Sequence, residues 1–271
     1  MCRKLKWVRV PEVVLHLGVL SVPAHFVLEA LAYSVGFALY RWNRNRDGDV
    51  VTRTERSSVI VAAVLGAAIG SKVLAWFEDP VALMHGAEAL WPGGKTIVGG
   101  LLGGTIAVEW EKRRLGIRAR TGDLFAIPIA VGIAVGRIGC FFGGIDDHTA
   151  GTPSNLPWAV DFGDGILRHP TQLYEIVFLT LLAAMLRQFR KLRPANGDLY
   201  RVFLFAYLVW RFAIDFLKPE PAFAGLSSIQ WCCVVGAVWY FRDVARIIRG
   251  RAGRGRTGGR AASRAGAYAN G

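Results

Sequence analysis

The sequence predicts an all-α membrane protein in which about seven transmembrane helices pack as a bundle, with the N-terminus outside and the C-terminus in the cytoplasm. Two observations carry this prediction. The chain of 271 residues is 53% hydrophobic yet has a formal net charge of +13, a combination that a soluble globular domain accommodates poorly. The apolar residues gather in runs and the basic residues lie between them, so apolar bulk and charge are segregated along the chain.

The apolar runs are the expected membrane spans, most of them near the roughly 20 residues that cross a bilayer core. In chain order they cover residues 17–40, 57–77, 96–110, 126–144, 172–186, 202–217 and 223–241. The runs 96–110 and 172–186 are short, and they reach full length only with flanking residues or as helices partly buried in the bundle. Several runs are rich in Gly and Ala, whose small size lets helix backbones approach closely. A packed bundle is therefore expected.

The domain organisation follows from these spans. Residues 1–16 form an N-terminal segment, and residues 17–241 form the transmembrane domain, with a long outer loop at 145–170. Residues 242–271 form a basic cytoplasmic tail rich in Gly, Arg and Ala, which we expect to be disordered. The first ten residues are charged and no clear small-residue cleavage site precedes the next span, so the first span is expected to remain in the mature protein.

The orientation is predicted by the arginine and lysine residues of the connections, because cytoplasmic loops are rich in them. Clusters follow the first, third, fifth and seventh spans, whereas the connections between contribute only Lys95, Arg168 and Lys218. Basic residues at the extreme N-terminus favour the opposite orientation, but four concordant connections outweigh them. The clusters are Arg41, Arg44, Arg46, Arg53 and Arg56; Lys112, Arg113, Arg114, Arg118 and Arg120; Arg187, Arg190, Lys191 and Arg193; and Arg242, Arg246, Arg249 and Arg251.

Several other classes of site find little support in the sequence. The basic residues form no aromatic-interleaved patch of the kind that binds nucleic acid. The four cysteines show neither metal-ligand spacing nor a disulfide framework. The outer-loop run Asp146–His148 has no second spaced set of ligands, so a solvated surface explains it better than a metal site. No cofactor or metal is expected.

Ionisable residues at membrane depth carry most of the functional information, because burying each one costs roughly 2.5–3.5 kcal/mol on insertion scales unless it is paired. Arg211 and Asp215 are spaced i, i+4 and could neutralise each other, which does not exclude a role in a site. Arg137 has no charged residue in its own span, so it needs a carboxylate from another helix, a lipid headgroup or a bound anion. Glu29, Glu175 and Asp215 are the candidate carboxylates.

Several motifs resemble one family of bacterial membrane enzymes. They are Gly-Arg-Ile-Gly-Cys-Phe-Phe-Gly-Gly at 136–144, Leu-Pro-Trp at 156–158 and Arg-His-Pro-Thr-Gln-Leu-Tyr-Glu at 168–175. Val-Gly-Gly-Leu-Leu-Gly at 98–103, Trp-Arg-Phe-Ala-Ile-Asp at 210–215 and Leu-Ser-Ser-Ile-Gln at 226–230 extend the likeness over all the spans. In these motifs the chain resembles the prolipoprotein diacylglyceryl transferase family, and the 168–175 stretch is the most specific of them.

The resemblance implies a seven-span enzyme of the bacterial inner membrane with an outside N-terminus. Members of the family move a diacylglyceryl group from phosphatidylglycerol to the thiol of a lipobox cysteine in a preprolipoprotein, releasing glycerol phosphate. By this resemblance Arg137 and Arg211 handle the phosphate, and Asp215 stands where the family has Glu. The expected substrate-binding residues are Gly99, Gly100, Cys140, Arg168, His169 and Glu175.

The chain departs from the family pattern at several polar positions. Val98 stands where the family has a His, Cys140 where it has an Asn, and Glu29 where its first span has a Tyr. Either the transfer runs with another general base, for which Glu29 and His169 are candidates, or the chemistry has changed. A divergent relative that uses another acceptor, or an inactive protein that binds anionic lipid, therefore remains an alternative. A transporter is a further alternative, although no inverted repeat is visible.

Overall fold

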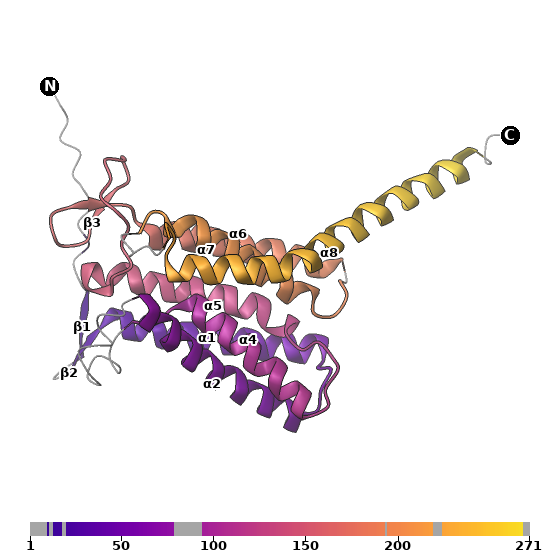
Figure 1. Cartoon of the computed structure of the whole chain (residues 1–271), viewed down its shortest axis with the longest axis horizontal. Coiled ribbons are helices and arrows are strands. Elements are labelled where there is room, and N and C mark those ends of the chain that lie inside the picture. Colours follow the sequence, from indigo (N-terminus) through magenta and orange to yellow (C-terminus); the bar gives the residue numbers. More distant parts are fainter. Residues whose placement is uncertain are drawn as a thin grey trace.

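The computed structural model describes residues 10, 13–17, 20–78, 94–192, 194–218 and 224–267, and from residue 250 onward the backbone alone. Seven α-helices lie in these parts of the chain, joined by one 3₁₀ turn and four short strands. The helices run side by side as a bundle, and α8 projects beyond it (Figure 1). The helices are α1 (Ala24–Asp47), α2 (Arg53–Glu78), α4 (Ile97–Arg114), α5 (Asp123–Phe142), α6 (Thr171–Lys191), α7 (Asp198–Asp215) and α8 (Ser228–Ala267).

Among the described residues, α2, α5 and α6 are long and apolar enough to cross a membrane, with mean hydropathies of 2.0, 2.0 and 1.2. The outer face of α2 illustrates the apolar exterior, because Val61, Val64, Leu65 and Ile69 are each more than half exposed. A row of exposed aliphatic side chains at helical spacing is what a lipid-facing surface requires. The fold is therefore a mostly helical membrane bundle.

The first predicted span begins too early. Leu17 and Leu20–Pro23 lie in strands and not in a helix, because β1 (Val14–Leu17) and β2 (Leu20–Pro23) pair as antiparallel strands. Helix α1 starts only at Ala24, directly after Pro23. Proline has no backbone N–H to donate and its φ is fixed, so it fits the residue before a helix, where the N–H has no intrahelical partner. The last span is similarly displaced, with α8 starting at Ser228 and continuing through residue 242 to Ala267.

Helices α2 and α4 are in direct backbone contact through glycines. A Cβ at Gly70 would overlap Gly99 O, and a Cβ at Gly103 would overlap Gly66 O. Side chains larger than hydrogen would push these helices apart, as in other small-residue interfaces within membranes. The predicted close packing of the Gly-rich runs is confirmed for this pair.

Helix α7 forms the centre of the bundle. Phe203, Leu204, Tyr207 and Leu208 have no exposed surface, and the helix packs against α5, α6 and α8. Because α7 runs antiparallel to α6 and α8, its C-terminal end meets the N-terminal ends of both (Figure 1). The strands β1, β2 and β3 (Val160–Asp161) lie at this same end of the bundle.

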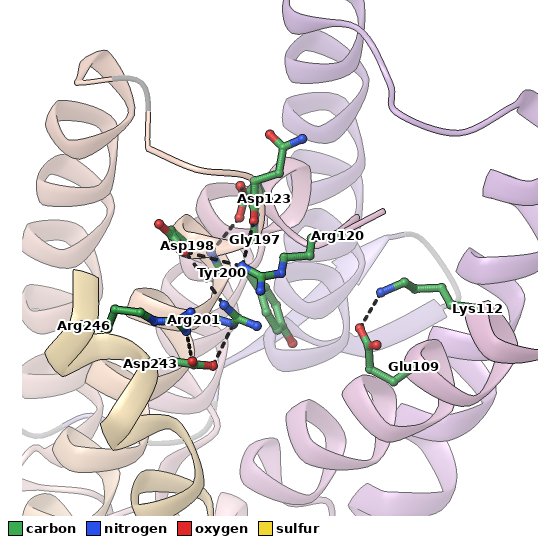
Figure 2. A network of polar contacts seen from close by, with 11 residues as sticks. Glu109, Lys112, Arg120, Asp123, Gly197, Asp198, Tyr200, Arg201, Asp243 and Arg246 are labelled. Carbon is green, nitrogen blue, oxygen red and sulfur yellow. Dashed lines mark hydrogen bonds and ion pairs between the residues drawn. The ribbon is translucent and has the colours of Figure 1, made fainter. Parts of the chain in front are cut away.

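A polar network fastens the opposite end of the bundle (Figure 2). Asp123 at the start of α5 accepts hydrogen bonds from Gly197 N at 2.7 Å and Tyr200 N at 3.0 Å, and so caps α7 from a neighbouring helix. Arg201 Nε of α7 lies 3.2 Å from Asp243 Oδ2 of α8, and Arg246 approaches the same carboxylate. These contacts fix the spacing of α5, α7 and α8 at the end that lies away from the strands.

Candidate functional site

Four buried ionisable residues gather where α5, α6 and α7 meet at the strand end of the bundle. Arg137 lies near the C-terminal end of α5, Glu175 in the second turn of α6, and Arg211 and Asp215 in the last turns of α7. Their exposed fractions are 6%, 2%, 5% and 3%. The antiparallel order of the helices brings these positions to one depth, which the sequence alone could not establish.

The partner of Arg137 is Glu175. Arg137 Nε lies 2.8 Å from Glu175 Oε2, and the hydroxyl of Tyr207 donates a hydrogen bond of 2.8 Å to Glu175 Oε1. Arg137 Nη1 also lies 3.8 Å from Cys140 Sγ, one turn further along α5. Glu175 was one of three carboxylates that the sequence offered for this pair.

Arg211 has its own carboxylate on the same helix. Arg211 Nη2 lies 2.7 Å from Asp215 Oδ1, so the i, i+4 spacing does produce an ion pair. Asp215 Oδ2 accepts a hydrogen bond from the hydroxyl of Ser227, which precedes α8. Arg211 Nη1 is buried and has no hydrogen-bond partner among the described residues. A buried donor without an acceptor costs about 1–3 kcal/mol, so this guanidinium is poised to gain from a bound anion.

The two ion pairs belong to one electrostatic cluster. Each arginine is paired with its own carboxylate, yet Glu175 is within electrostatic range of both Arg137 and Arg211. The hydroxyl of Tyr207 is influenced by the same three residues. Lys218, just beyond α7, interacts with all four charged residues of the cluster. When Lys218 is protonated, three cations face two carboxylates, an excess of positive charge that suits an anionic ligand.

Glu29 lies in a different group of residues. Its carboxylate accepts a hydrogen bond of 3.1 Å from the Tyr33 hydroxyl, lies 3.3 Å from Lys95 Nζ, and lies 3.8 Å from His25 Nε2. The expectation that Glu29 could pair with Arg137 is wrong. Because α1 begins at Ala24, Glu29 sits near the start of that helix and beside Lys95, which precedes α4. Its helix does pack on α5, since Gly139 lies against Leu28 and His25.

The loop of residues 145–170 folds back over the end of α7. Thr152 N donates to Leu217 O at 2.7 Å, and Gly151 N donates to His169 O at 2.9 Å. His169 Nδ1 lies 3.3 Å from the Tyr174 hydroxyl, which also accepts a hydrogen bond of 2.7 Å from Trp158 Nε1.

Arg168 and the acidic run of the loop are placed differently. Arg168, in β4 (Leu167–Arg168), is paired with Asp164 at 2.7 Å. His148 is exposed, and the side chains of Asp146 and Asp147 lie outside the described part of the chain.

The glycines expected to bind substrate pack against a helix. A Cβ at Gly99 would overlap Gly70 O of α2, and one at Gly100 would lie 3.6 Å from Ala67 O. Val98 is 1% exposed and belongs to the apolar core. This part of α4 therefore contributes tight helix packing, and position 98 contributes no ionisable group.

An apolar cavity of about 280 Å³ lies between α5 and α6. Ile138 and Ile176 line it, and they directly follow Arg137 and Glu175 in the chain. Val131, Ala134, Leu179 and Thr180 are also in its wall. The apolar space thus lies between the same two helices that carry Arg137 and Glu175, an arrangement that fits an amphipathic ligand.

Three members of the cluster were missed by reasoning from the sequence. Tyr207 lies within an apolar run, Ser227 precedes a helix, and Lys218 is the single basic residue of a connection that the sequence predicts to face outward. The burial of all three depends on contacts between helices that are distant in the sequence. A lysine three residues after Asp215 was the one available signal, because that spacing returns to the same side of a helical turn.

Comparison with known proteins identifies relatives of the chain. A sequence model of the family described as prolipoprotein diacylglyceryl transferase matches residues 12–241. The chain is 32% identical over 250 residues to the phosphatidylglycerol–prolipoprotein diacylglyceryl transferase of Bordetella parapertussis, covering 85% of this chain and 92% of that protein. It is 32% identical over 231 residues to the protein of the same name from Glaesserella parasuis, covering 79% and 82%. With that of Methylococcus capsulatus it shares 35% identity over 178 residues, covering 64% and 65%.

Proposed function

The chain belongs to the prolipoprotein diacylglyceryl transferase family, and we propose that it transfers a diacylglyceryl group from phosphatidylglycerol to the thiol of a lipobox cysteine in a prolipoprotein. Glycerol phosphate is the leaving group. The single observation that carries the proposal is the buried cluster of Arg137 and Arg211, in which one guanidinium nitrogen of Arg211 has no partner among the described residues. Guanidinium groups are suited to phosphate because they are always charged and present several donors in one plane.

In the proposed reaction Arg137 and Arg211 bind the phosphate of the lipid. Thiolate sulfur attacks the glyceryl carbon next to the phosphate oxygen, the carbon–oxygen bond breaks, and its electron pair leaves with glycerol phosphate. The leaving phosphate gains one negative charge in this step, which the two guanidinium groups stabilise. Glu175 and Asp215 hold the guanidinium groups in place, and Tyr207 and Ser227 hold those carboxylates.

The apolar parts of the donor need an apolar surface. We assign an acyl chain of the lipid to the cavity between α5 and α6, because Ile138 directly follows Arg137 and Ile176 directly follows Glu175, the ion-pair partner of Arg137. Cys140, within 3.8 Å of Arg137, lies at the junction of the polar and apolar regions. Arg168 and His169 belong to the outer loop that covers the cluster, where the acceptor peptide would approach. Gly99 and Gly100 contribute by keeping α4 close to α2.

We propose that the site faces the outer side of the bacterial inner membrane. The arginine-rich connections lie at the far end of the bundle from the cluster, as the connection between α4 and α5 and that between α6 and α7 illustrate. By the positive-inside rule that end is cytoplasmic. We therefore propose seven spans, an outer N-terminus and a cytoplasmic C-terminus, with residues 17–241 as the transmembrane domain, loop 145–170 outside and residues 242–271 inside.

Complementation tests the proposed function. A bacterium depleted of its own transferase is given this chain, and a model lipoprotein is analysed by mass spectrometry for the mass of a diacylglyceryl group on its cysteine. We expect the modification with the wild-type chain and with Arg113→Gln, an exposed arginine at the far end of the bundle. We expect none with Arg137→Gln or Arg211→Gln. An unmodified lipoprotein in the presence of a folded, membrane-inserted wild-type chain would refute the proposal.

A further inference from the structure

Lys218 is the third cation of the buried cluster, and neither phosphate binding nor the sequence motifs gives it a role. It follows α7, and its backbone N–H donates a hydrogen bond of 3.0 Å to Asp215 O. The preceding carbonyl, Leu217 O, accepts a hydrogen bond from Thr152 N of the outer loop. Lys218 is thus fixed between the end of α7 and the loop that covers the site, and its side chain is partly buried.

The surroundings of Lys218 contain two arginines and two carboxylates. Its amino group interacts with Arg211 and Asp215 of α7, with Arg137 of α5 and with Glu175 of α6. His169 is the titratable residue of the loop segment packed beside it, since Gly151 contacts both His169 and Leu217 O. A guanidinium does not lose its proton in a protein, so the lysine is the cation of this group that can become neutral.

The charge state of Lys218 follows from burial and from these neighbours. Burial lowers its pKa to about 7, with the repulsion from Arg211 and Arg137 acting in the same direction and Glu175 and Asp215 opposing it. At neutral pH, a large fraction of the molecules therefore carry Lys218 as a free amine. An amine with a pKa near the working pH is the most effective kind of general base.

We propose that the free amine of Lys218 accepts the proton of the acceptor thiol during diacylglyceryl transfer. The inference rests on the proposed function. It supplies the proton acceptor that Val98 cannot provide, and it places that acceptor among the phosphate-binding residues. The described contacts of Glu29 are instead with His25, Tyr33 and Lys95, and the ring of His169 bonds to Tyr174.

The step balances in atoms and charge. The thiol hydrogen moves to Lys218 Nζ, the sulfur forms a bond to the glyceryl carbon, and the bond between that carbon and the phosphate oxygen breaks. The amine becomes an ammonium ion while the phosphodiester monoanion becomes a phosphate monoester dianion. With Lys218 neutral, the two arginines and two carboxylates sum to zero, and protonation raises the cluster to +1 as the leaving group gains its second negative charge. Each change stabilises the other.

The alternative role for Lys218 is that of a permanent cation that binds phosphate. Lys218→Arg distinguishes the two roles, because arginine keeps the charge and cannot lose its proton. Lys112→Arg is the matched control, since Lys112 is a buried lysine with a carboxylate beside it, 2.8 Å from Glu109, at the far end of the bundle. Transfer from phosphatidylglycerol to a lipobox peptide is measured with the purified full-length chain between pH 5.5 and 9.

We expect the wild-type rate to rise with pH and level off above an apparent pKa near 7. Lys218→Arg should lose about 10²- to 10⁴-fold in rate, the usual contribution of a general base, and its profile should lack that transition. Lys112→Arg should match the wild type. An active Lys218→Arg with the wild-type pH profile would overturn the inference and leave the proposed function intact. A wild type that forms no thioether at any pH would overturn both.

A spectroscopic readout keeps the inference testable even if Lys218→Arg folds poorly. The lysines of the full chain in detergent are reductively methylated with ¹³C-formaldehyde, and the methyl resonances are followed during a pH titration. We expect one resonance to titrate near pH 7, to be absent from Lys218→Arg and to be present in Lys112→Arg. Titration of every lysine above pH 9 would contradict the proposed role.

Discussion

Arg137 of α5 and Glu175 of α6 form a buried ion pair, with Arg137 Nε 2.8 Å from Glu175 Oε2. The pair joins the two helices that also enclose the apolar cavity, so the polar and apolar parts of the proposed lipid site share one helix interface. The Tyr207 hydroxyl connects this pair to α7, which carries Arg211. The site is therefore built on three rigid helices, and its electrostatics depend on their relative positions.

Removing the carboxylate of this pair should destabilise the bundle. Glu175→Gln leaves the guanidinium of Arg137 buried without its counter-charge, and breaking a buried pair in this way costs about 3–5 kcal/mol. Tyr207→Phe removes only a hydrogen bond to that carboxylate and should cost about 1.5–3 kcal/mol. Thermal unfolding of the purified variants in detergent measures both. Equal stability of Glu175→Gln and the wild type would show that the pair is not formed.

The glycine contact between α2 and α4 predicts opposite effects at two neighbouring glycines. Gly103→Ala should destabilise the protein, because its Cβ would overlap Gly66 O. Gly100→Ala should be neutral or stabilise by up to about 1 kcal/mol, because its Cβ meets nothing closer than 3.6 Å and alanine favours a helix. Unfolding temperatures of the two variants give the comparison. Similar losses at both positions would argue against the close contact.

The environment of Lys218 also predicts how stability varies with pH. Burial lowers its pKa to about 7 from 10.5, so between these values the folded chain holds fewer protons than the unfolded chain at this group. The lowered pKa therefore reduces the free energy of unfolding. This loss is complete below pH 7 and is relieved as the pH rises toward 10.5, by at most about 1.4 kcal/mol per pH unit. The stability of the wild type relative to Lys218→Gln should therefore rise from pH 7 to pH 9. A difference that stays constant over this range would be inconsistent with the lowered pKa.

Glu29 should affect activity less than the arginines do. Its carboxylate is one quarter exposed and joins α1 to Lys95 before α4, and partly exposed pairs of this kind contribute about 0–1 kcal/mol. Glu29→Gln should lower the rate of transfer by less than about tenfold, whereas Arg137→Gln should abolish it. The lipobox-peptide assay measures both variants. Complete loss in a folded Glu29→Gln protein would return Glu29 to the centre of the reaction.

Part of this site could be predicted from the sequence because it depends on local spacing. The i, i+4 relation of Arg211 and Asp215 indicated their ion pair, and the isolated charge of Arg137 indicated a partner on another helix. The identity of that partner depends on where α1 starts. Pro23 and a short pair of strands set this start, so that Glu29 lies beside Lys95.

The role of Lys218 could not be predicted in the same way. The residues that surround it come from α5, α6 and the outer loop, and no local pattern encodes their approach. Its surroundings arise only from the packing of α7 against those elements.

A double-mutant cycle on Arg137 and Arg211 tests the central claim, that the two guanidinium groups serve one phosphate. The catalytic efficiency of transfer is measured for Arg137→Lys, Arg211→Lys and the double variant, with Arg113→Lys as control. If both arginines act on the same phosphate, the loss in the double variant is much smaller than the product of the single losses. Losses that multiply, as expected for separate and independent sites, would contradict the claim.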